Sequence, residues 1–80
     1  PVEALKIDRS FVMAMEASRR NSDIVETIIT LSNRLGLAAI AEGVETQAQL
    51  EHLHHLGCEL AQGYWFAKPL SVTAAETLIA

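Results

Sequence analysis

The feature that most constrains the fold is an apolar run over residues 37–41 that ends abruptly at Glu42 and, after a Gly-Val pair, Glu45. Such a run is typical of a buried strand, and the pattern after it is that of a turn opening a helix. In parallel sheets and in β/α barrels, ligands and chemistry are found at the carboxyl ends of strands. This position favours a functional role for Glu42. Glu45 directly precedes the expected helix cap, Thr46, so stabilisation of the helix dipole explains it equally well.

The composition excludes several classes of partner and compartment. The 80 residues have a formal charge of −4 and no basic cluster, which argues against binding to a DNA or RNA backbone. The ten acidic residues leave room for a divalent cation. No apolar run approaches the ~20 residues of a membrane span. A single cysteine, Cys58, cannot form an internal disulfide, which fits a reducing, cytoplasmic setting.

Apolar spacing and capping signals predict strands and helices in alternation. Strands are expected over residues 2–7, 37–41 and 59–66. Helical spacing within residues 8–20 predicts one to two turns, and a longer helix is expected over residues 23–35. A third helix begins at Thr46, with Gln49 completing a capping box, and a last one follows Ser71. The longer helix is expected to present one apolar stripe, formed by Ile24, Ile28, Leu31 and Leu35.

The order strand, helix, three times over, is typical of parallel β/α units. Two α/β architectures satisfy it. One is a small three-layer sheet with helices on both faces. The other is a sector of a TIM-type β/α barrel, of which 80 residues would make about a third, since such barrels run to ~250 residues.

Polar side chains lie at the end of each predicted strand. Lys6 and Asp8 come at the end of the first, Glu42 and Glu45 at the end of the second, and Gln62 on the third. If the strands are parallel, these groups converge at one edge of the sheet. Acids and a lysine suit phosphoryl chemistry assisted by a divalent metal. An ion-pair cluster that stabilises loops explains them as well.

Other polar residues are interpreted as structural. His52 and His55 are three residues apart on one predicted helix, but no acid or cysteine completes a zinc set, and a surface position is expected. Cys58 is expected to be an unreactive core thiol, because nothing beside it would act as a base.

Three segments together resemble the carboxyl-terminal half of the EAL domain, a family that hydrolyses the bacterial second messenger cyclic di-guanylate. They are residues 5–12, 40–46 and 56–64, which read LKIDRSFV, IAEGVET and LGCELAQGY. The resemblance covers essentially the whole chain, in order and with family-like spacing. It implies a barrel fold in which residues 1–80 are the carboxyl-terminal fragment, the last three βα units with parallel strands.

The resemblance also implies a role for each polar residue at the strand ends. Lys6 looks like the catalytic lysine, and Glu42 like a metal ligand that assists deprotonation of water. Asp8 resembles the acid at the second metal, Gln62 an active-site glutamine near the substrate. Glu45 resembles a residue that holds a loop beside the site and couples it to dimerisation. The implied cofactors are Mg²⁺ or Mn²⁺, in a two-metal phosphodiesterase site.

The resemblance implies an incomplete site as well. The family's Glu-Ala-Leu motif and further metal ligands lie upstream of the part matched here, and Glu3-Ala4-Leu5 spells those letters by accident. We therefore expect no hydrolysis from the fragment alone, and expect it to self-associate. The parent is expected to be a homodimeric phosphodiesterase, with sensory or membrane domains allowed upstream. The alternative is a non-catalytic EAL-like module that senses the nucleotide or binds a protein.

Overall fold

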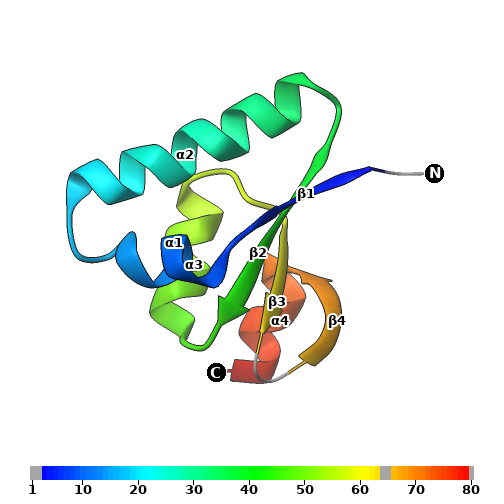
Figure 1. The fold of residues 1–80 in the computed structure, drawn as a ribbon. Helices are drawn as coiled ribbons and strands as arrows, with labels where there is room; N and C mark the ends of the chain where they lie inside the picture. Colours follow the sequence, from blue (N-terminus) through cyan, green and yellow to red (C-terminus); the bar gives the residue numbers. More distant parts are fainter. Residues whose placement is uncertain (1–2, 64–65, 80) are drawn as a thin grey trace.

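The computed structural model describes residues 3–63 and 66–79, which form one sheet and four helices (Figure 1). The strands lie in the order β1-β2-β3-β4 across the sheet. In chain order the elements are β1 (Ala4–Ile7), α1 (Arg9–Ala14), α2 (Arg19–Arg34), β2 (Ala38–Val44), α3 (Gln47–His55), β3 (Leu60–Gly63), β4 (Phe66–Ser71) and α4 (Val72–Ile79).

All four helices pack on one face of the sheet. Ile7, Ala41 and Ala61 stand side by side on this face, and none is more than 1% exposed. They belong to a single hydrophobic core that receives side chains from every helix: Val12, Val25, Ile29, Leu50, Leu53, Val72 and Ala75. The arrangement is a sheet with one helical layer, as in a sector of a β/α barrel. The three-layer alternative is therefore wrong.

The first three strands are parallel, as predicted. Lys6 is opposite Ile40 in the pairing of β1 with β2, and Ala41 is opposite Ala61 in the pairing of β2 with β3. The carboxyl ends of these strands therefore meet at the same edge of the sheet. This edge carries the polar residues singled out from the sequence.

The fourth strand was not predicted. β4 runs antiparallel to β3, with Leu70 opposite Ala61, and it contains Pro69. Proline is tolerated here because β4 is an edge strand, where its missing N–H removes no ladder hydrogen bond. The predicted third strand also included Tyr64 and Trp65, which lie outside the described residues.

The long helix starts earlier and buries a different face than expected. α2 begins at Arg19 because Ser18 caps it, with the Ser18 hydroxyl accepting a hydrogen bond from the Asn21 N–H. Its buried residues are Val25, Ile29 and Ser32. The predicted stripe mostly faces outward: Ile24, Leu31 and Leu35 are 42%, 56% and 64% exposed, and Ile28 is half-buried.

The capping box at Thr46 was predicted correctly, whereas the cap of α2 was expected near residue 23 and is Ser18. Thr46 and Gln49 form a complete capping box at the start of α3, each side chain bonding to the other's backbone N–H. Gly36 takes a positive φ of 74° just after α2, where the Leu37 N–H donates back to the Ser32 carbonyl. None of the helices in the described ranges combines the length and the apolar character needed to cross a membrane.

Candidate active site

Glu42 lies in an irregular stretch at the carboxyl end of β2. The pairing of β2 with β3 shifts between Ala41 and Val44, so β2 carries one residue more than its neighbour in this interval. Such a bulge bends the strand and redirects the side chains beside it. It is made possible by Gly43, whose φ of 72° lies in the left-handed region that glycine adopts without steric cost.

Lys6 and Glu42 meet on the face of the sheet opposite the helices. Lys6 is in register with Ile40, and Glu42 follows Ile40 by two residues, so strand alternation places both on this face. The Lys6 Nζ lies 3.8 Å from the Glu42 Oε2, with side-chain exposures of 59% and 35%. An ion pair this long and exposed contributes little stability. Both groups remain accessible to a ligand.

Gln62 belongs to the same face and the same end of the sheet. Leu60 is opposite Ile40, and Gln62 is two residues further along β3, as Glu42 is along β2. Both Glu42 and Gln62 are half-buried. The backbone therefore brings Lys6, Glu42 and Gln62 to one edge from three adjacent parallel strands, as expected from the sequence.

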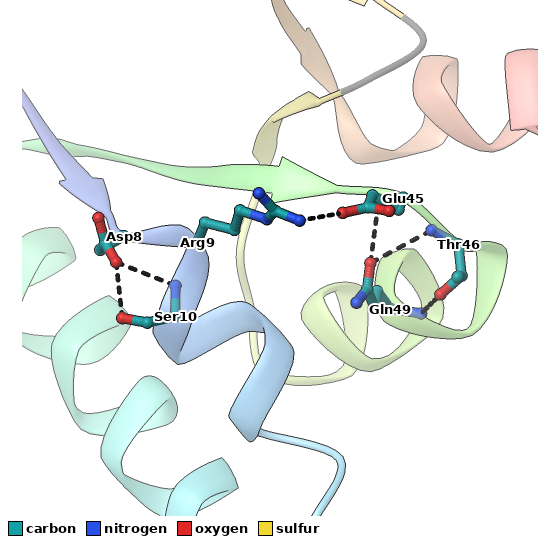
Figure 2. A network of polar contacts seen from close by, with 6 residues as sticks. All are labelled: Asp8, Arg9, Ser10, Glu45, Thr46 and Gln49. Atoms are coloured by element: carbon teal, nitrogen blue, oxygen red, sulfur yellow. Dashed lines mark hydrogen bonds and ion pairs between the residues drawn. The ribbon is translucent and has the colours of Figure 1, made fainter.

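Asp8 caps a helix in this structure. Its Oδ2 accepts hydrogen bonds from the Ser10 hydroxyl at 2.6 Å and from the Ser10 N–H at 2.9 Å, which starts α1 (Figure 2). These two bonds, the hydroxyl's first, lower the pKa of the Asp8 carboxyl. Asp8 is exposed and sits at the end of β1, so its carboxylate is ionised and adjacent to the candidate site.

Glu45 is held from two sides (Figure 2). Its carboxylate Oε1 accepts a hydrogen bond from the Arg9 Nη2 at 3.1 Å. Its backbone N–H donates to the Gln49 Oε1 at 2.7 Å, and the same oxygen accepts from the Thr46 N–H at 3.2 Å. The turn between β2 and α3 is therefore bonded both to the start of α1 and to the first turn of α3.

Sequence reasoning gave no role to two residues of this network, Arg9 and Ser10, and saw only the capping role of Gln49. Ser10 had a detectable signal, since a serine two residues after an aspartate is a common helix start. Arg9 had none, because its contact with Glu45 spans 36 residues of sequence.

The predicted metal ligands match a divalent cation in kind but not in number. Carboxylate oxygens, as in Asp8 and Glu42, are the donors that Mg²⁺ and Mn²⁺ prefer. Within residues 3–63 and 66–79, however, no three His, Cys, Asp or Glu side chains come together in a metal-binding group. These residues alone do not form a metal site.

The prediction that the histidines lie at the surface is only partly correct. His54 and His55 are exposed, but His52 is half-buried, and its Nε2 lies 2.7 Å from the Ser22 hydroxyl of α2. His52 therefore joins α3 to α2. The expectation of a buried thiol is confirmed, since Cys58 is 2% exposed and donates to the Leu60 carbonyl at 3.2 Å.

The face that carries Lys6 and Glu42 belongs to a β/α-barrel type of sheet, and comparison with known proteins gives its family. The EAL domain family model matches residues 1–69, and the chain belongs to this family. It is 47% identical, over 99% of its length, to the cyclic di-GMP phosphodiesterase NbdA of Pseudomonas aeruginosa. It spans only 10% of the length of NbdA.

Solved EAL structures share the fold. The EAL domain of Mycobacterium smegmatis DcpA is 40% identical and superposes with a TM-score of 0.72, over 99% of this chain and 35% of that one. The cyclic di-GMP complex of the PaMucR phosphodiesterase is 39% identical with a TM-score of 0.74, over 94% of this chain and 30% of that one. The fold is thus part of a TIM-like barrel, with β1, β2 and β3 as its parallel strands.

Proposed function

We propose that residues 1–80 are the carboxyl-terminal portion of an EAL domain that hydrolyses cyclic di-GMP to the linear dinucleotide. The observation that carries the proposal is the meeting of Lys6 and Glu42, 3.8 Å apart, at the carboxyl ends of adjacent parallel strands. Named phosphodiesterases among the relatives support it. We call the whole barrel containing this segment the complete domain.

Each residue at the edge has a task in the proposed reaction. The Lys6 ammonium neutralises a non-bridging phosphate oxygen of the substrate or orients the attacking water. The Glu42 carboxylate accepts a proton from that water. The Gln62 amide hydrogen-bonds the substrate. Arg9 is 62% exposed beside Glu45, and the Arg9–Glu45 contact holds the turn next to this edge.

Divalent cations enter the proposal as part of the complete domain. Mg²⁺ or Mn²⁺, when bound, polarises the phosphate and acidifies water. Glu42 and Asp8 would supply carboxylate oxygens from this segment, with the other ligands coming from outside it. Because the Asp8 Oδ2 already accepts two hydrogen bonds as the cap of α1, the oxygen that Asp8 would offer to the cation is Oδ1.

The experiment is an assay of the complete domain with cyclic di-GMP and Mg²⁺ or Mn²⁺. Release of the linear dinucleotide supports the proposal, provided that chelation of the metal abolishes it. Tight binding of the nucleotide with no turnover would instead favour a non-catalytic sensor module. If the complete domain neither binds nor hydrolyses the nucleotide, both functions are contradicted.

An apolar groove beside β1 bears on how the segment behaves alone. The groove has a volume of about 350 Å³ and is lined mainly by Leu5, Phe11, Ile28, Leu31 and Leu35. It lies along β1, which is an edge strand of the sheet. Exposed apolar surface beside an unpaired strand edge favours association with another chain. In the complete domain, we expect the preceding βα unit to cover it.

The isolated 80-residue segment is therefore expected to self-associate. Sedimentation velocity at increasing concentration should show dimers or larger species. The double variant Leu31→Glu, Leu35→Lys should weaken this association, because both side chains are more than half exposed and leave the core intact. Thr30→Glu, on the same helix, is the matched control and should leave it unchanged. A compact monomer that unfolds cooperatively would contradict the prediction.

We place the protein in the cytoplasm and expect the complete domain to form a homodimer. The first statement is supported by Cys58, a free thiol buried in the core, whose Sγ lies 3.2 Å from the Leu60 carbonyl oxygen and 3.6 Å from that of Ala39. The second rests on the resemblance alone. Gel filtration of the complete domain tests the homodimer.

Cys58 also makes stability depend on pH. Burial raises the pKa of its thiol, so unfolded chains lose this proton first. The contribution of the buried thiol to the free energy of unfolding is complete below about pH 8.5. Above that pH it falls by up to ~1.4 kcal/mol per pH unit until the folded thiol ionises. Urea denaturation of the complete domain from pH 7 to 10 should show this loss, and Cys58→Ala should show a shallower one. Equal slopes in the two proteins would refute it.

A further inference from the structure

We propose that Arg9 is a positioning residue that ties the β1 end carrying Lys6 to the bulge carrying Glu42, and so sets the distance between these two groups. The inference rests on the proposed function for its catalytic consequence, but its structural part stands without it. It is drawn from two contacts of the Arg9 side chain, one with Gly43 in the bulge and one with Glu45 just beyond it. Figure 2 shows the second of them.

The first contact is between the aliphatic stem of Arg9 and the backbone of Gly43. A Cβ built on Gly43 would lie within 3.0 Å of the Cβ, Cγ and Cδ of Arg9. The stem therefore rests on the bare Cα of the glycine. Gly43 is needed for this close approach as well as for its positive φ of 72°. The aliphatic stem of Arg9 thus covers the backbone of the bulge at Gly43.

The second contact is made by the guanidinium group of Arg9. Its Nη2 donates to the Glu45 Oε1 at 3.1 Å, two residues beyond Gly43. With side-chain exposures of 62% and 46%, this ion pair by itself adds little stability. Its effect is on geometry, because the same side chain is in contact with the bulge and with the residue that ends the turn.

The far side of the turn is fixed independently. Gln49 is only 8% exposed, and its Oε1 accepts hydrogen bonds from the backbone N–H groups of Glu45 and Thr46. Glu45 is thereby fixed by Gln49 through its backbone and by Arg9 through its carboxylate. If Arg9 is removed, the backbone between Ala41 and Glu45, which contains Glu42, is therefore the part of this region that gains mobility.

The position of Arg9 itself, at the start of α1, is equally well defined. Arg9 is the first residue of α1, and Asp8 caps that helix through Ser10. Lys6 is only three residues before Arg9, on the strand that leads into the cap. Arg9 therefore links a rigid helix start, adjacent to Lys6, with the bulge that presents Glu42. Through its contacts with Gly43 and Glu45, Arg9 acts on the relative position of Lys6 and Glu42.

The test uses three variants of Arg9 in the complete domain. Arg9→Ala removes stem and charge, Arg9→Met keeps a stem over Gly43 without the charge, and Arg9→Lys keeps both in part. Arg19→Ala, an exposed truncation at the start of α2, is the matched control. The measurements are kcat and KM for cyclic di-GMP, and amide hydrogen exchange of residues 42–46.

Arg9→Ala should lower kcat by about ten- to a hundredfold with KM changed less than about threefold, a loss in the range expected for misplacing a reacting group. Exchange of residues 42–46 should rise in the same variant. Arg9→Lys should recover most of kcat and Arg9→Met less, while Arg19→Ala stays at the parent values. A loss of fold alone would not produce this graded recovery.

Two results would overturn the inference. One is parental kcat together with parental exchange of residues 42–46 in Arg9→Ala. The other is equal loss in Arg9→Ala and Arg9→Lys. If the complete domain proves to have no hydrolytic activity, the proposed function fails, and exchange alone then decides: a rise confined to residues 42–46 in Arg9→Ala supports the role of Arg9, and no rise overturns it.

Discussion

Glu42→Gln in the complete domain is expected to lower kcat for cyclic di-GMP about a thousandfold, within the range for loss of a general acid or base. The amide has the size and shape of the carboxylate, but it cannot accept a proton from water and carries no charge to pair with Lys6. The 3.8 Å contact between Lys6 and Glu42 would lose its electrostatic component. The measurement is the initial rate of linear dinucleotide release at saturating substrate.

The matched control is Glu51→Gln, which makes the same chemical change on the exposed side of α3. It should leave kcat unchanged. The urea midpoint of Glu42→Gln should stay near that of the parent, because the ion pair is exposed and weak. A rate for Glu42→Gln within about threefold of the parent would remove Glu42 from the reaction as a proton acceptor.

The parts of the site that sequence alone predicted are those with local causes. The apolar run 37–41 defines a strand whatever surrounds it, and alternation then decides which face Glu42 and Gln62 occupy. The Thr46–Gln49 capping box is closed within four residues. Once the strands are taken as parallel, Lys6 and Glu42 must meet at one edge. The contact between them follows from the pattern.

The parts that could not be predicted depend on contacts between distant segments. Two sets of apolar residues on α2 have helical spacing. One includes Val25 and Ile29, and the other includes Ile24 and Leu31. Only packing against the sheet decides that the first pair is buried. Likewise, the position of Pro69 is compatible with a strand only because β4 is an edge strand of the sheet. Local sequence patterns do not determine the order of strands in a sheet.

The role of Arg9 shows the same limit at the candidate site. Its contact with Glu45 requires the bulge of β2 with the positive φ of Gly43, and the cap at Asp8, which lie in segments far apart in the sequence. Sequence reasoning identified Asp8, Glu42 and Glu45 as a group of charges. It could not distinguish the acid that caps α1 from the one that pairs with an arginine, because both follow the end of a strand.

Gly63→Ala is expected to cause a large loss of stability, about 3 kcal/mol or more, at the upper end of the range for overpacking. A Cβ on Gly63 would collide with the carbonyl oxygen of Val44 and lie 2.9 Å from its C and 3.0 Å from its N. These are backbone atoms of the paired strand β2, so no side chain can turn away to make room. β3 would have to separate from β2.

Gly36→Ala provides the comparison, because Gly36 has a positive φ of 74° but no heavy atom within 4 Å of the added methyl group. Its cost should be backbone strain alone, about 1 kcal/mol. Urea denaturation of the complete domain, followed by circular dichroism, measures both. Equal losses for the two variants would show that β3 can move away from Val44 at little cost. A much larger loss for Gly63→Ala would mean that the pairing of Val44 with Gly63 holds the site-bearing ends of β2 and β3 together, next to Glu42 and Gln62.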